Sequence, residues 1–170
     1  MIIGIGGPSR SGKSTLARLL VNHYRDSGLT SIVIYQDDFV FPTPLIPKIK
    51  DKVDWECPDS INHNLLLEIV AFYKTRFHVL IIDGFLAFHD PRLVKQYNKK
   101  LFVEVTKETY LLRKENDLRW GDIPRWFFEH IWNSYIEYGI PDFSKQDYIR
   151  ISGETEYDIK KIIPLLEKEI

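Results

Sequence analysis

The sequence predicts a three-layer α/β domain with a mostly parallel, five-stranded sheet and helices on both faces. Strand-like and helix-like runs alternate along its 170 residues. The strand-like runs are mostly continuous apolar stretches, which is typical of strands covered on both faces. A phosphate-binding pattern also lies between the first strand-like run and the first helix-like run. Together these three observations predict a P-loop NTPase fold.

The phosphate-binding pattern is G-x-x-x-x-G-K-[ST], at residues 7–14. Residues 1–6 before it are β-branched and apolar, as expected of a buried parallel strand. After it, apolar residues from Leu16 to Tyr24 recur at helical spacing, and Gly28 offers a stop signal. The loop can therefore direct backbone N–H groups and the positive end of a helix dipole at one polyphosphate.

This loop predicts residues that bind ATP and its phosphates. Lys13 is expected to act as a catalytic cation on the β- and γ-phosphates, and the Ser14 hydroxyl to bind Mg²⁺. A solvated lysine on a Gly/Ser loop is the alternative, which the flanking strand and helix disfavour. The predicted phosphate-binding residues of the loop are Gly7, Ser9, Arg10, Ser11, Gly12, Lys13, Ser14 and Thr15.

The later runs continue the alternation. Short apolar runs predict strands at residues 31–35, 79–83, 101–105 and 148–151. Three prolines at residues 41–47 predict an irregular connection. Helical spacing predicts a helix capped by Asp59 or Ser60 that runs through Tyr73. Further helices are predicted at about 107–119, at about 124–138 with aromatic side chains that pack a core, and at about 155–168 with a bend at Pro164.

The composition limits the classes of binding partner that we expect for this chain. The 23 basic and 24 acidic residues give a net charge of -1, which offers no electrostatic reason to expect nucleic acid or an anionic membrane. The single Cys57 cannot form an intramolecular disulfide, and no run approaches the roughly 20 apolar residues of a membrane span. We therefore expect one cytoplasmic domain over residues 1–170, with a small lid around residues 113–125.

Carboxylates follow two of the predicted strands, where an open parallel sheet binds its ligands. Asp83 ends the run 79–83 and is predicted to hold Mg²⁺, although a carboxylate in a turn is the alternative. Asp37 and Asp38 follow the run 31–35. One of them would accept the proton of an attacking hydroxyl, as a kinase needs, or would simply cap a turn.

Arginines flank the predicted lid. Charge spreads over the oxygens of a transferring phosphoryl group, and a fork of donors meets that charge better than a point charge does. Arg113, Arg119 and Arg125 surround residues 120–124, where Gly and Pro suggest a mobile segment. At least one of these arginines is expected to reach phosphate.

Four segments together resemble the nicotinamide riboside kinases, with the uridine kinases as the wider group. They are residues 7–15, 35–39, 82–88 and 124–138, and the most specific are the QDDF and DGFLAF elements. The resemblance implies that Asp37 is the catalytic base for a substrate 5′-hydroxyl. It also implies that Asp83 stands where the family has a metal-associated glutamate.

The resemblance also implies an acceptor site and further nucleotide contacts. Trp55 would stack on the substrate ring, and Glu56 would grip the ribose 2′- and 3′-hydroxyls, where the family usually has aspartate. Gly153 would lie by the adenine. Arg113 is the best match for a catalytic lid arginine, and Arg119 is the next.

Three functions are considered for this sequence. The first is ATP-dependent phosphorylation of a ribonucleoside at its 5′-hydroxyl, with nicotinamide riboside first and uridine or cytidine as the alternative. The second is a non-catalytic NTP-binding module or GTPase-type switch, which lacks support because residues 98–101 do not complete the N-K-x-D element. The third is a P-loop kinase for a metabolite other than a nucleoside.

Overall fold

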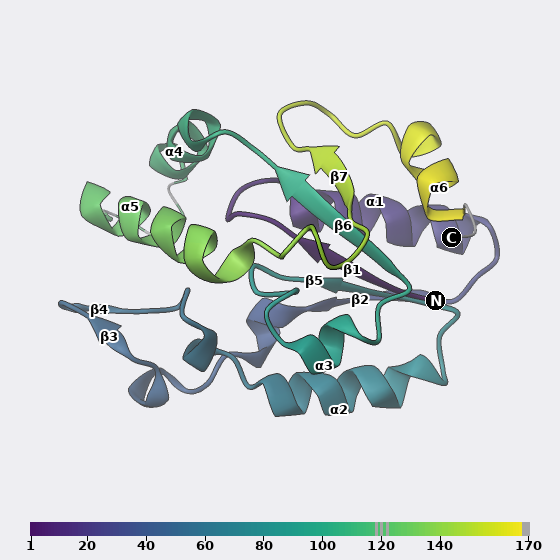
Figure 1. The fold of residues 1–170 in the computed structure, drawn as a ribbon, viewed down its shortest axis with the longest axis horizontal. Coiled ribbons are helices and arrows are strands. Elements are labelled where there is room, and N and C mark those ends of the chain that lie inside the picture. The colour runs from purple at the N-terminus through teal and green to yellow at the C-terminus, as the bar shows by residue number, and fades with distance from the viewer. Residues whose placement is uncertain (118, 120, 122, 168–170) are drawn as a thin grey trace.

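A single parallel sheet organises the chain. The computed structural model describes residues 1–117, 119, 121 and 123–167. The sheet has the strand order β2-β5-β1-β6-β7, and each of the four neighbouring pairs is parallel (Figure 1). The strands are β1 (Ile2–Gly6), β2 (Ser31–Tyr35), β5 (Val79–Asp83), β6 (Lys99–Glu104) and β7 (Ile149–Ser152). The predicted five-stranded parallel sheet is therefore confirmed.

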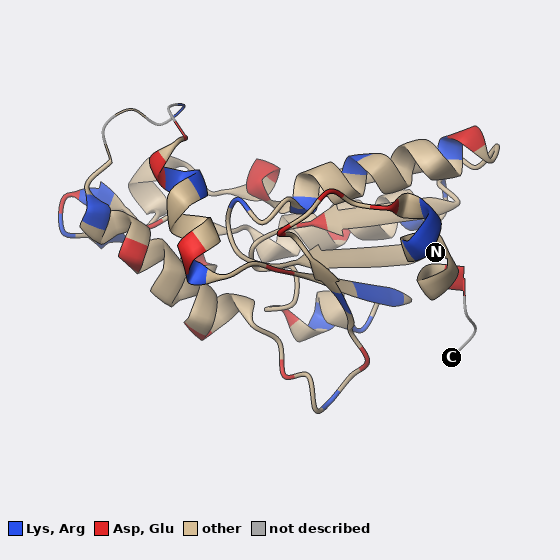
Figure 2. Cartoon of the chain, turned by 90° about the horizontal axis from the view of Figure 1, so that it is seen from above, with Lys and Arg blue, Asp and Glu red and all other residues tan. Residues whose placement is uncertain are grey.

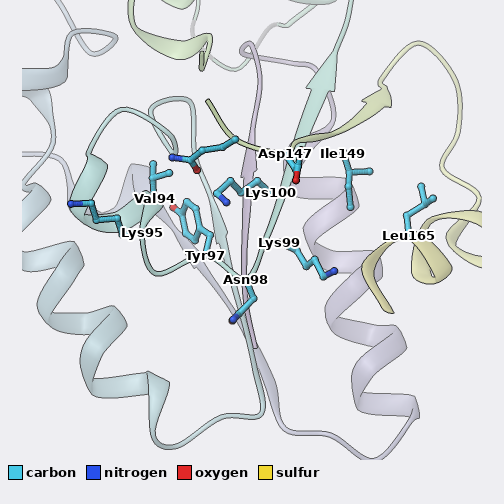
Figure 3. A pocket seen from close by; sticks show the side chains of 10 residues that line it. Val94, Lys95, Tyr97, Asn98, Lys99, Lys100, Asp147, Ile149 and Leu165 are labelled. Carbon is cyan, nitrogen blue, oxygen red and sulfur yellow. The ribbon is translucent and has the colours of Figure 1, made fainter. Parts of the chain in front are cut away.

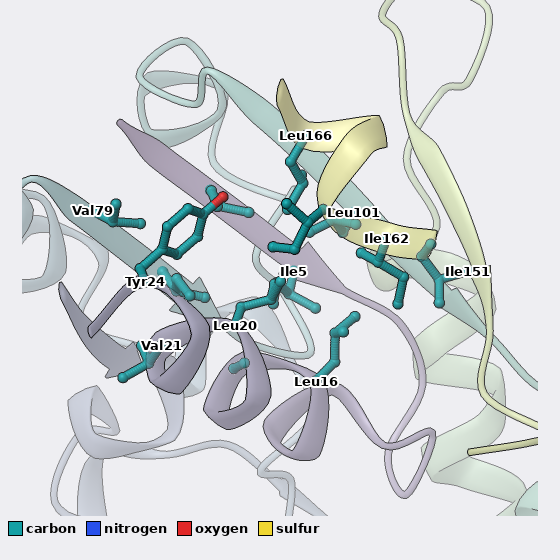
Figure 4. Close-up of a cluster of buried hydrophobic side chains, with 14 of the residues drawn as sticks. Ile5, Leu16, Leu20, Val21, Tyr24, Val79, Leu101, Ile151, Ile162 and Leu166 are labelled. Carbon is teal, nitrogen blue, oxygen red and sulfur yellow. The ribbon is translucent and has the colours of Figure 1, made fainter. Parts of the chain in front are cut away.

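Helices cover both faces of this sheet. On one face, α1 (Lys13–Asp26) and α6 (Ile159–Glu167) pack Leu16, Leu20 and Ile162 onto strand residues such as Ile5 and Leu101 (Figure 4). On the other face, α2 (His63–Lys74) and α3 (Pro91–Val94) bury a second apolar cluster against β1, β2 and β5. The predicted three-layer arrangement is therefore correct.

A third apolar cluster lies beyond the carboxyl ends of the strands. It joins α4 (Lys107–Glu115) to α5 (Arg125–Ser134) through Tyr110, Phe127 and Ile131. Ile49 packs against it from a two-stranded hairpin, β3 (Lys48–Ile49) and β4 (Lys52–Val53). The aromatic helix thus packs a separate cluster rather than the faces of the sheet, and it continues into a π-helical turn at Tyr135–Gly139.

Some predicted boundaries were wrong. The cap of α2 is Asn62, whose Oδ1 accepts the Leu65 N–H at 3.1 Å, because Pro58–Ser60 form a 3-10 turn instead. α4 ends at Glu115 rather than near residue 119, and the Asn116 side chain donates to the Leu112 carbonyl at 2.7 Å. α6 begins at Ile159 rather than near residue 155, next to Asp158, whose Oδ1 accepts the Lys160 N–H at 3.1 Å.

Two elements were not predicted, namely the β3–β4 hairpin and α3. Strands of two residues and a helix of four residues are too short to show a period in the sequence. The predicted irregular connection contains a 3-10 turn at Thr43–Leu45, and another such turn, Gln36–Phe39, follows β2.

Two expectations concern the surface and the lid. In the view of Figure 2, basic and acidic segments are both scattered over the ribbon, in keeping with the net charge of -1. No helix within the described part of the chain is long and apolar enough to cross a membrane. The predicted lid, residues 113–125, includes positions 118, 120 and 122, which lie outside the described residues.

Candidate functional site

The phosphate loop between β1 and α1 is shaped by local backbone geometry. Gly12 caps α1 with a φ of 98°, in the left-handed region where a side chain is strained. A Cβ at this position would lie 2.6 Å from the Tyr157 hydroxyl oxygen, so the loop requires glycine there. The Lys13 side chain is buried, and its Nζ donates to the Pro8 carbonyl at 2.8 Å. Lys13 therefore folds back over the loop that carries it.

Groups from distant parts of the chain hold this loop from outside. The Tyr157 hydroxyl donates to the Ser11 carbonyl at 3.2 Å. The Arg113 guanidinium donates through Nη1 to the Arg10 carbonyl at 3.1 Å and through Nη2 to the Gly153 carbonyl at 2.8 Å. The structure thus brings the predicted residues Arg113 and Gly153 to the loop. Arg113 meets backbone carbonyls there, so its two terminal nitrogens are already engaged.

The two predicted metal ligands are neighbours. Asp83 ends β5 and is buried with an exposed fraction of 4%. Burial raises the pKa of Asp83, while the Lys13 charge and the nearby Ser14 side chain lower it. Oδ1 of Asp83 is buried without a hydrogen-bond partner among the described residues.

This donor set fits a magnesium ion that is shared with phosphate. A hydroxyl and a carboxylate oxygen are the hard oxygen ligands that Mg²⁺ takes, and the unpartnered Oδ1 of Asp83 leaves one ligand position to fill. Within the described ranges, no three His, Cys, Asp or Glu side chains are grouped so that they could hold a metal ion. Most of the coordination would therefore come from water and phosphate oxygens, as is usual for Mg²⁺.

Asp37 shares this site. It is exposed in the turn Gln36–Phe39, and its negative charge, together with that of Asp83, raises the pKa of Lys13 against the larger lowering by burial. Lys13, Asp37 and Asp83, which come from the carboxyl-end side of β1, β2 and β5, therefore lie within electrostatic reach of each other. Asp38 is exposed in the same turn.

Gln36 fixes the turn that carries Asp37, and the sequence reasoning missed it. Its side chain is buried, and Oε1 accepts the Leu86 N–H at 2.8 Å. A Cβ on Gly84 would collide with the Gln36 side chain, so the segment after β5 can approach only with glycine there. Gln36 thus ties the carboxyl end of β2 to that of β5. Its partners are about fifty positions away in sequence, so no local pattern marks it.

The predicted acceptor residues lie on the loop after β4. Trp55 is 41% exposed, and Glu56 has a buried Oε2 without a hydrogen-bond partner among the described residues. Burial raises the pKa of Glu56 to about 7, against a smaller lowering by the Lys114 charge. Lys114 is itself buried on α4, and burial lowers its pKa while Glu56 raises it. Lys114 is a second residue that the sequence reasoning missed, because nothing in its spacing distinguishes it from a solvated helix lysine.

The loop that carries Trp55 and Glu56 is attached to α5. The His130 ring nitrogen Nε2 lies 2.8 Å from Asp54 Oδ1, and the Lys50 ammonium lies 4.1 Å from the centre of the Trp126 ring. These contacts hold the segment next to Trp55 and Glu56 against α5. The predicted acceptor residues are therefore positioned by tertiary contacts of a loop that has little regular structure of its own.

Two of the predicted phosphate ligands, Arg10 and Arg119, meet at one carboxylate. Asp117 Oδ2 lies 3.6 Å from Arg10 Nε, and Asp117 Oδ1 lies 2.7 Å from Arg119 Nε. Arg119 also donates through Nη2 to Asp117 Oδ2 at 2.7 Å. The arginines hold the pKa of Asp117 down at about 2, with the Arg119 hydrogen bonds as the largest cause.

A separate pocket lies at the amino-terminal ends of the strands, at the end of the sheet opposite to the phosphate loop. Its volume is about 560 Å³, and it is lined by residues at the amino ends of β6 and β7, including Lys99, Lys100 and Ile149 (Figure 3). The phosphate loop follows the carboxyl end of β1 in the same parallel sheet. This pocket is therefore not part of the nucleotide site.

We expect Glu56→Gln to stabilise the protein at alkaline pH. The raised pKa means that the folded state favours protonated Glu56, so this contribution to stability is complete below pH 4.5, its ordinary pKa, and is lost as the pH rises to about 7. Glutamine avoids the buried charge. The free energy of unfolding of the variant should exceed that of the wild type by about 1–3 kcal/mol at pH 8.

The difference should close between about pH 4 and 5, where the wild-type carboxyl is neutral. Urea denaturation at several pH values measures it, and Glu68→Gln on the exposed side of α2 is the control. A pH-independent difference between Glu56→Gln and the wild type would contradict the assignment.

Comparisons with known proteins point to one group of enzymes. The chain is 27% identical to human nicotinamide riboside kinase 1 over 173 residues, covering 92% of this chain and 82% of the relative. It is 29% identical to a uridine kinase of Leuconostoc citreum over 146 residues, covering 69% of each chain. No protein-family model matches the chain.

A solved structure shares the fold. It is a possible uridine kinase from Bacillus stearothermophilus, with a TM-score of 0.56 and 17% identity, and the likeness covers 89% of this chain and 88% of that one. The P-loop NTPase fold predicted from the sequence is confirmed. So is the resemblance to nicotinamide riboside kinases and uridine kinases.

Proposed function

We propose that this chain is an ATP-dependent kinase that transfers the γ-phosphoryl group to the 5′-hydroxyl of a ribonucleoside, with nicotinamide riboside as the acceptor. The similarity to human nicotinamide riboside kinase 1 over most of both chains supports this proposal. The single observation that carries it is the convergence of Lys13 with Asp83 and Asp37, whose charges both act on the lysine. A P-loop cation, a metal-binding carboxylate and an exposed carboxylate base are the parts that phosphoryl transfer to a hydroxyl requires.

The proposed mechanism divides the site into a donor half and an acceptor half. Backbone N–H groups of the loop and the Lys13 ammonium would hold the β- and γ-phosphates, while Arg113 keeps the loop in shape through the Arg10 and Gly153 carbonyls. Ser14 and Asp83 would hold Mg²⁺, which supplies charge neutralisation at the β- and γ-phosphate oxygens. Asp37 would accept the proton of the 5′-hydroxyl as its oxygen attacks the γ-phosphorus and the bond to ADP breaks.

The acceptor half would bind the sugar and its ring. Glu56 has an unpartnered carboxylate oxygen, so a pair of sugar hydroxyls could donate hydrogen bonds to it. Burial raises the pKa of Glu56 to about 7 and the Lys114 charge opposes this rise, so part of the Glu56 carboxyl is ionised near neutral pH. Trp55 presents an exposed indole face on which a pyridine or pyrimidine ring can stack.

We infer that residues 1–170 form one kinase domain and that the segment around residues 113–125 acts as its lid.

A second candidate is a uridine or cytidine kinase. The similarity to the uridine kinase of Leuconostoc citreum favours it. Stacking on Trp55 suits a pyrimidine and a pyridine equally, so the ring contacts do not separate the two acceptors. Phosphorylation of a metabolite other than a nucleoside would leave the Glu56 carboxylate without a pair of ribose hydroxyls to bind.

A coupled assay of ADP release tests the proposal. Nicotinamide riboside, uridine, cytidine and several sugars are compared at equal concentration with Mg²⁺ and ATP. We expect substrate-dependent ADP with nicotinamide riboside, at a specificity constant at least about tenfold above that for any sugar that lacks the ring. A response to uridine and cytidine alone would favour the second candidate, and no response to any nucleoside would refute both.

A further inference from the structure

The two arginines that meet at Asp117 come from different parts of the molecule. Arg10 belongs to the phosphate loop, and Arg119 follows the end of α4. The Asp117 side chain is only 4% exposed, whereas those of Arg10 and Arg119 are 37% and 64% exposed. The carboxylate is thus covered while both guanidinium groups still reach solvent.

Both arginines keep unused hydrogen-bond donors. Arg119 binds Asp117 through Nε and Nη2, and Arg10 approaches it through Nε. Within the described part of the chain, Arg119 Nη1 and the two terminal nitrogens of Arg10 have no hydrogen-bond partner. Arg113 differs, because both of its terminal nitrogens bind backbone carbonyls. Arg10 and Arg119 are therefore the guanidinium groups near the loop that have donors to offer to an anion.

The Asp117 carboxylate also reduces the repulsion among three neighbouring cations. Arg10, Lys114 and Arg119 all lie close enough to interact, and the charges of the two arginines lower the pKa of Lys114. Three cations in one place repel each other in the absence of phosphate, and long arginine side chains lose conformational entropy when they are held. The charge and bidentate geometry of Asp117 offset both costs before any nucleotide binds.

We propose that Asp117 is a positioning residue that holds Arg10 and Arg119 together as a two-arginine fork for the terminal phosphate of a nucleoside triphosphate. This inference rests on the proposed function in one respect, namely that the loop binds ATP. The backbone N–H groups of the loop remain available for the inner phosphates, which ATP and ADP share, so loss of the fork weakens ATP binding more than ADP binding.

Direct nucleotide binding to the full chain tests this inference. Calorimetry with Mg²⁺-ATP and with Mg²⁺-ADP, without an acceptor, gives the two dissociation constants for the wild type, Asp117→Asn and Asp117→Glu. We expect Asp117→Asn to weaken ATP binding about tenfold and ADP binding less than about twofold, because each arginine loses a charge-assisted contact. Asp117→Glu keeps the charge and should restore at least half of the lost preference for ATP.

Asp142→Asn is the matched control. Asp142 also has a pKa lowered to about 2, through Lys145 and Ser144, and it lies on the loop before β7. This variant should bind both nucleotides like the wild type. Thermal unfolding of each variant without nucleotide shows whether it is folded.

The outcomes separate this inference from the proposed function. An unchanged ratio of the ATP and ADP dissociation constants in Asp117→Asn would overturn the inference, and so would an equal loss of both affinities in a folded protein. A wild type that binds ATP more tightly than ADP but phosphorylates no nucleoside would refute the proposed acceptor. It would not contradict the proposed role of Asp117. A wild type that binds neither nucleotide would refute both.

Discussion

Asp37→Asn is expected to lower the turnover number by about a thousandfold while the dissociation constant for ATP stays within about twofold of the wild-type value. Asparagine keeps the size and position of the side chain but cannot accept the proton of the attacking hydroxyl. Asp37 is exposed and lies beyond the buried Lys13 and Asp83, so the phosphate loop does not depend on it for packing. Initial rates with saturating acceptor, together with ATP titrations, measure the two quantities.

The neighbouring carboxylate supplies the control for this prediction. Asp38 is exposed in the same 3-10 turn and carries the same charge, and Asp38→Asn should turn over at no less than about a third of the wild-type rate. The sequence alone left open which of the two carboxylates is the base. The charge of Asp37, and not that of Asp38, is among the causes that shift the pKa values of Lys13, Asp83 and Glu56. Full activity of Asp37→Asn would show that another group takes the proton.

Lys13→Met is expected to lower the turnover number by about a hundredfold or more. Methionine matches the length of the lysine stem, but it removes the only side-chain cation of the phosphate loop that is buried with Asp83. The charge that develops on the transferring oxygens would then lack a fixed counter-charge in a site where water is scarce. The rate at saturating ATP and acceptor, measured by ADP release, reports this loss.

The same variant should remain folded. Burial lowers the pKa of Lys13, which shows that the surrounding structure disfavours the charge, and Asp83 can take up a proton once the lysine is gone. We expect the melting temperature without nucleotide to change by less than about 5 °C. Lys74→Met, at the exposed end of α2, is the control and should keep wild-type activity. A wild-type turnover number for Lys13→Met would refute the catalytic role of this lysine.

Much of the fold was predictable because its signals are local. Continuous apolar runs marked the five strands, and the glycine and lysine pattern marked the loop between β1 and α1. The boundaries of α2, α4 and α6 were less predictable, because a cap is chosen among several nearby polar side chains. Asp59, Ser60 and Asn62 are all acceptable caps by residue type, and the 3-10 turn at Pro58–Ser60 decided for Asn62.

The sequence by itself determined the parallel α/β fold, the phosphate loop, the acidic pair that follows β2 and the aspartate that ends β5, since each depends on neighbours along the chain. Only the tertiary structure decided which distant groups act on one another. Gln36 accepts a hydrogen bond from Leu86, the Lys114 charge acts on Glu56, and Asp117 joins Arg10 to Arg119. A side chain that is ordinary in sequence becomes a partner when folding buries it beside an unpaired charge, because the loss of water makes that interaction strong. Burial and long-range approach are properties of the folded chain, and they bring Asp83 and Asp37 to the lysine of the phosphate loop.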